Sequence, residues 1–60
     1  MNDSEVLIEF QRIGSIVRVT AIHAATGTEA IFQAPANTSH NDLQRMAVKK
    51  LNYVLQKKKD

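Results

Sequence analysis

The first half of the chain alternates apolar and polar residues with a period of two. Between residues 5 and 12, Val6, Ile8 and Phe10 share one face of an extended segment. Residues 16–23 repeat the alternation and are rich in β-branched side chains, which favour strands. Because successive side chains of a strand point to opposite faces of a sheet, both segments are predicted to be strands with one apolar face.

Gly14 and Ser15 separate these two segments. Glycine as the first central residue is typical of a two-residue hairpin turn of type II′. Such a turn also places Glu9 diagonal to Arg18, within reach of a favourable charge pair. The residues that it sets opposite one another are Ile13 and Ile16, Phe10 and Val19, and Ile8 and Ala21.

A second turn is expected at residues 25–28, followed by a short strand over 29–34 that Pro35 ends. If Ala24 opposes Glu29, Phe32 meets Ala21 on the inner face. Ala30 and Ala34 then point inward together with Phe32.

A helix is predicted over residues 40–57. Ser39 followed by Asp42 gives the S-x-x-D form of a capping box, and the closing lysines suit the negative end of the helix dipole. At 100° per residue one apolar stripe forms, from Leu43, Ala47, Leu51, Val54 and Leu55, with Val48 at its margin.

The predicted fold is therefore α+β: a single domain over residues 1–60, with a three-stranded antiparallel meander sheet and one C-terminal helix packed on one face. The helix is expected to cover Phe10, Val19 and Phe32. Sixty residues without cysteine lie near the lower limit for an independent core, so a partner would add stability.

Composition indicates a cytoplasmic protein with no membrane partner. The first residues are acidic and polar, unlike a secretory signal, and no run approaches the roughly 20 apolar residues that cross a bilayer. The lack of cysteine fits a reducing compartment.

No catalytic, cofactor-binding or metal site is predicted, and we expect the chain not to be an enzyme. His23 and His40 have no carboxylate or second histidine at metal-ligand spacing. Ser4, Ser15 and Ser39 are expected in a terminus, a turn and a helix cap, with no base beside them.

Two surfaces are candidates for binding. The uncovered sheet face carries four aliphatic side chains, which indicate a homodimer or an unknown protein partner. Charged substitutions at Leu7 and Ile31 are expected to abolish association without unfolding the chain. The four candidate interface residues are Leu7, Ile16, Ile22 and Ile31.

The alternative function is nucleic-acid binding by the basic helix. Tyrosine beside lysines can stack a base and hold phosphates, with steep salt dependence. A solvated helix face explains the same residues, and the net charge of only +2 favours that explanation. The candidate patch consists of Arg45, Lys49, Lys50, Tyr53 and Lys57.

Several segments together resemble a family of small uncharacterised alphaproteobacterial proteins, a domain of unknown function. The resemblance spans nearly the full chain and implies a bacterial cytoplasmic setting, with no activity and no catalytic residues to carry over. Ala24-Ala25 departs from the acidic residue expected near that turn. The segments that carry the resemblance are Phe10, 12–14, 17–22, 25–29, Pro35 and 47–55.

The strand order followed by a helix also resembles the double-stranded RNA-binding domain. That family has a further helix before its sheet and a basic cluster at the start of its last helix. Here the predicted helix begins at Ser39-His40-Asn41-Asp42, with Lys49 and Lys50 two turns later. The likeness is therefore one of topology only.

Overall fold

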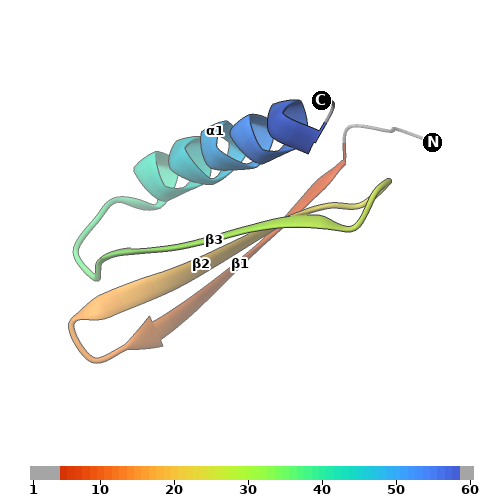
Figure 1. The fold of residues 1–60 in the computed structure, drawn as a ribbon. Helices are drawn as coiled ribbons and strands as arrows, with labels where there is room; N and C mark the ends of the chain where they lie inside the picture. Colours follow the sequence, from red (N-terminus) through yellow and green to blue (C-terminus); the bar gives the residue numbers. More distant parts are fainter. Residues whose placement is uncertain (1–4, 59–60) are drawn as a thin grey trace.

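The computed structural model describes residues 5–58. Three strands are followed by one helix: β1 (Val6–Ile13), β2 (Ile16–His23), β3 (Thr28–Pro35) and α1 (His40–Lys58). The strands form one antiparallel sheet in the order β1-β2-β3, and α1 lies across one face of it (Figure 1). The predicted meander with one C-terminal helix is thus confirmed.

The β1–β2 hairpin forms as predicted. Gly14 has a φ of 61°, while no other residue type in the described chain has a positive φ, so Ser15 keeps a negative one. This combination fits a type II′ turn. Ile13 pairs with Ile16 and Phe10 with Val19, which confirms the predicted register.

The predicted β2–β3 register is wrong by two residues. His23, not Ala24, closes this hairpin and pairs with Thr28. The N–H of Gly27 donates to the carbonyl of His23 at 2.8 Å, and Gly27 has a φ of 73°. The loop therefore ends at Gly27 and β3 begins one residue earlier than expected.

The register shift changes the neighbours of β3 residues but not the face on which they lie. Phe32 pairs with Val19 and not with Ala21, which pairs with Ala30. Because the strand period is two, a two-residue shift keeps Ala30, Phe32 and Ala34 on the inner face, which is the face that α1 covers.

The start of α1 follows the predicted cap. Ser39 Oγ accepts a hydrogen bond from the N–H of Asp42 at 3.1 Å, and the Ser39 carbonyl accepts the first helical bond, from Leu43, at 3.0 Å. The reciprocal half of the capping box is replaced by another contact, because the Asp42 carboxylate pairs with Arg45.

The core lies between α1 and the inner face of the sheet. Val54 and Leu55 pack against it half-buried, and Val48 at the margin of the stripe is 40% exposed. The helix lies mainly over β3 and β2 and least over β1. The buried apolar residues are Val17, Val19, Ala21, Ala30, Ala34, Leu43, Ala47 and Leu51.

Phe10 lies on β1, the strand that α1 covers least. The ring of His40 supplies part of the cover over Phe10. The two ring centroids are 4.5 Å apart and the planes are tilted by 53°. His40 is exposed, and its ring packs on the partly buried Phe10 at the first turn of α1.

Within residues 5–58, no helix has both the length and the apolar character that crossing a lipid bilayer requires.

Candidate interaction surfaces

The outer face of the sheet is the one turned away from α1, and it holds all four candidate interface residues. Leu7 is 53% exposed and Ile31 is 50% exposed. Ile16 and Ile22, on the central strand, are half-buried by their neighbours. Leu7 and Ile31 are thus the more accessible members of the predicted interface.

The pairing register divides these aliphatic side chains into two clusters. Leu7 lies opposite Ile22, with Ile31 diagonal to it, and we name these three residues the Leu7 cluster. At the other end of the sheet lies the Ile13 cluster, which consists of Ile13, Ile16 and Pro35.

A polar row of Gln11, Arg18 and Gln33 crosses the sheet between the two clusters. Leu7 and Ile13 are six residues apart on β1, or about 20 Å at the rise of a strand. The predicted interface is therefore two apolar patches with a polar row between them.

Ile13, which is 48% exposed, is absent from the predicted interface. The signal for it was in the sequence: Ile13 pairs with Ile16 across the Gly14–Ser15 turn, and paired residues share a face. An outward position for Ile16 therefore implies the same position for Ile13.

Glu9 and Arg18 are diagonal on the outer face, as the register predicts. They do not form a salt bridge, because the one ion pair found within residues 5–58 joins Arg45 to Asp42. Both charges of Glu9 and Arg18 are exposed to solvent and can meet a partner.

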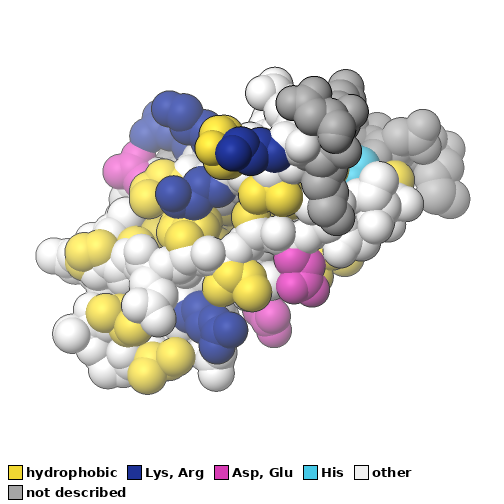
Figure 2. Space-filling view, in the orientation of Figure 1, with side chains coloured by type: hydrophobic (Ala, Val, Ile, Leu, Met, Phe, Trp, Pro, Cys, Tyr) yellow, Lys and Arg dark blue, Asp and Glu magenta, His cyan; other side chains and the backbone are white. Residues whose placement is uncertain are grey.

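The basic candidate patch is divided along α1. Figure 2 shows basic side chains gathered over the helix. Lys49, Lys50 and Tyr53 lie on the flank next to β3, whereas Arg45 is paired with Asp42 three residues earlier. The Lys57 Nζ lies 5.5 Å from the centroid of the Tyr53 ring.

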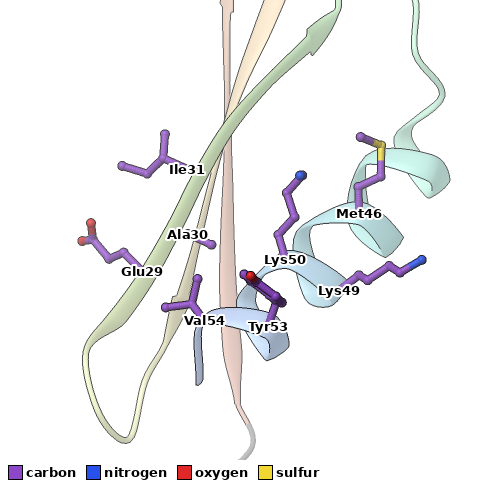
Figure 3. A pocket seen from close by; sticks show the side chains of 8 residues that line it. All are labelled: Glu29, Ala30, Ile31, Met46, Lys49, Lys50, Tyr53 and Val54. Atoms are coloured by element: carbon purple, nitrogen blue, oxygen red, sulfur yellow. The ribbon is translucent and has the colours of Figure 1, made fainter. Parts of the chain in front are cut away.

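A groove of about 690 Å³ runs between β3 and this flank of α1. We name it the β3–α1 groove. Ala30 points toward the helix, while Glu29 and Ile31 point away from it, toward the outer face (Figure 3). Met46, Lys49, Lys50, Tyr53 and Val54 line the helix side.

Lys50 connects the groove to the core. Its Nζ lies 5.6 Å from the centroid of the Phe32 ring, a cation–π distance. Tyr53 is 60% exposed, so its side chain is accessible to a ligand. The groove therefore combines positive charge, an accessible aromatic ring and the edge of a strand.

The two histidines take part in local packing and turn structure. His23 Nδ1 is hydrogen-bonded to Thr26 Oγ1 at 2.9 Å, and Thr26 Oγ1 in turn accepts the N–H of Thr28 at 3.3 Å. In the described part of the chain, no three histidine, cysteine or acidic side chains come together in a way that could hold a metal ion.

The fold and these surfaces define a small β-β-β-α domain with one uncovered apolar sheet face and one basic groove. The chain belongs to the family described as Domain of unknown function (DUF6898), whose model matches residues 3–58. No curated protein and no solved structure matches it. The resemblance to a domain of unknown function is confirmed, and an alphaproteobacterial origin stays a prediction.

Proposed function

We propose that this domain is a non-enzymatic protein-interaction module that self-associates through its outer face. One observation carries the proposal: Leu7, Ile13 and Ile31 are each about half exposed on a sheet face that α1 leaves uncovered. Burial of apolar surface stabilises an association by about 25 cal/mol per Å². A second copy that covers this face would bury both of its apolar clusters.

The charges on the outer face favour one arrangement of two copies. If the strands of the two sheets run in the same direction, β2 lies over β2 of the second copy, so that Arg18 faces Arg18. If they run in opposite directions, the Leu7 cluster of each copy covers the Ile13 cluster of the other. Glu9 then comes beside Arg18 of the second copy, and like charges are separated.

The size of the face sets the expected strength of association. Three strands of eight residues present about 400 Å² in projection, at roughly 4.8 Å between strands and 3.4 Å per residue. Stable dimers bury about 800 Å² per partner. We therefore expect a weak dimer whose population rises with protein concentration.

The test is the double variant L7E/I13E, which places a carboxylate in each apolar cluster. Sedimentation over a range of concentrations should show the wild type approaching a dimer and the variant remaining a monomer with an unchanged circular dichroism spectrum. The matched control is V48E, which changes an exposed valine on α1 and should dimerise normally. Equal association of L7E/I13E and the wild type would refute the outer-face dimer.

The arrangement of the two copies has its own test in the same measurement. E9R and R18E each bring like charges together and should weaken association. The exchange variant E9R/R18E restores opposite charges and should recover it. If the exchange variant loses as much association as the two single variants lose together, the two sheets do not run in opposite directions.

A second candidate function is nucleic-acid binding, favoured by the exposed Tyr53 ring with Lys57 near it. Pairing with Asp42 leaves Arg45 less able to bind a phosphate. A single-stranded oligonucleotide should bind with an affinity that falls steeply between low and moderate salt. A titration that does not depend on salt would remove this function.

A further inference from the structure

The open edge of β3 has backbone groups that no strand pairs. β3 is an edge strand, because the sheet order ends with it. Beyond its end, the N–H of Ala36 donates to the carbonyl of Ser15 at 2.9 Å. In an antiparallel ladder hydrogen-bonded pairs alternate with non-bonded ones. Since the Ala36–Ser15 pair is hydrogen-bonded, every second residue back along β3 is hydrogen-bonded too, so the backbone groups of Ala34, Phe32 and Ala30 bond to β2.

The residues between them therefore direct both their N–H and C=O groups away from the sheet. These residues are Glu29, Ile31 and Gln33, and all three are exposed. Pro35 ends this edge because it has no N–H to offer. The free edge is thus short, well defined and ready to pair with three residues of an added strand.

The β3–α1 groove lies directly beside this edge. A strand added to β3 would lie about 4.8 Å from it and alternate its side chains between the two faces. Inward side chains would enter the groove, beside Lys49, Lys50 and Tyr53. Outward side chains would extend the outer face, next to Ile31.

Charge selects the occupant of the groove. Lys49 and Lys50 favour acidic side chains at the inward positions of an added strand. Glu29 points toward the outer face and disfavours acidic side chains at the outward positions of that strand. A second copy is disfavoured, because pairing β3 with itself about Ile31 brings the two Lys49–Lys50 pairs together. Nucleic acid is disfavoured as well, because its phosphates have no donors for the edge carbonyls.

We propose that the β3 edge and the β3–α1 groove bind an extended acidic peptide of a partner protein as an antiparallel fourth strand. Its acidic residues alternate with apolar ones, so that acid faces α1 and apolar side chains join the outer face. This mode of recognition takes affinity from main-chain hydrogen bonds and specificity from alternate side chains.

The probe is a capped peptide of alternating Glu and Val with eight residues, the length of β3. On binding, the amide hydrogens of Glu29, Ile31 and Gln33 should become protected from exchange, because each gains an acceptor. A Lys–Val peptide of the same length should bind at least tenfold more weakly. Equal binding of the two peptides, or no added protection at these amides, overturns the proposal.

Two N-methylated peptides test the strand pairing without changing any charge. Directly paired residues of an antiparallel ladder share a face, so the Val residues bond to the outward Glu29, Ile31 and Gln33. Methylation of the Val nitrogens should abolish binding, and methylation of the Glu nitrogens should leave it within about twofold. Equal binding of both methylated peptides overturns the proposal.

Protein variants test the role of the groove. K49E/K50E should bind the Glu–Val peptide at least tenfold more weakly than the wild type. R12E/R45E, which changes the net charge equally but outside both the groove lining and the outer face, should stay within about threefold. An equal loss in both variants, or tighter binding of a single-stranded oligonucleotide to the groove residues, overturns the proposal.

Discussion

Gly27 occupies the last position of the loop between β2 and β3, with a φ of 73°. In this conformation its N–H reaches the carbonyl of His23, and the chain turns into β3 at Thr28. A β-carbon added at Gly27 would meet no atom within 4 Å. The restriction on this residue is therefore one of backbone conformation and not of space.

We predict that G27A lowers the free energy of unfolding by about 1–2 kcal/mol, the cost of the left-handed conformation for an L-residue. G27N should lose less, because asparagine adopts this conformation more readily. Urea denaturation followed by circular dichroism measures both. Equal losses for the two variants would indicate that the loop rearranges and that the dihedral angle does not set the cost.

The two hairpins differ in how far sequence determines them. A two-residue loop at Gly14–Ser15 allows one pairing, Ile13 with Ile16, and that pairing is observed. A four-residue loop containing Gly27 can close at Ala24 or at His23. Both choices keep every side chain on the same face, so the alternation pattern cannot distinguish them.

Among the elements, α1 depends on a narrow apolar stripe. Leu51 is fully buried at its centre, against the inner face of the sheet. The helical period predicts this burial, since residues three and four apart share a face. The same period does not reveal that Asp42 neutralises Arg45, although an acidic residue three positions earlier is a visible signal for such a pair.

We predict that L51A costs about 2–5 kcal/mol, through lost burial and the cavity left behind. A domain of this length has roughly 3–9 kcal/mol of stability in total. L51A should therefore be mostly unfolded or have a much lower thermal midpoint. V48A, at the exposed margin of the same helix, should change stability by less than about 0.5 kcal/mol. Similar losses in both variants would contradict the packing of α1 on this stripe.

In the molecule as a whole, the outer face and the β3 edge share one boundary. Ile31 belongs to the Leu7 cluster, and its backbone groups face the open edge. This continuity was not readable from the sequence, because it depends on which groups of β3 bond to β2. A strand bound at the edge would place its outward side chains on the surface that we propose for self-association.

The two proposed binding events should therefore strengthen one another. A bound Glu–Val peptide adds a fourth strand with outward valines to the outer face. If this adds even 40 Å² of buried apolar surface per dimer, the gain is about 1 kcal/mol, or roughly a fivefold lower Kd of self-association. By linkage, dimerisation must tighten the binding of the two peptides by the same factor in total, or about twofold for each peptide.

Sedimentation at saturating peptide measures this coupling. The control is a Glu–Ser peptide, which keeps the inward acid and the main-chain bonds but offers no outward apolar side chains. It should bind the groove and leave the Kd of self-association unchanged, while K49E/K50E without peptide should dimerise like the wild type. If both peptides lower the Kd of self-association equally, the coupling originates in the groove and passes through α1. An enlarged outer face is then not its cause. No coupling by the Glu–Val peptide would mean that the dimer interface stops short of β3.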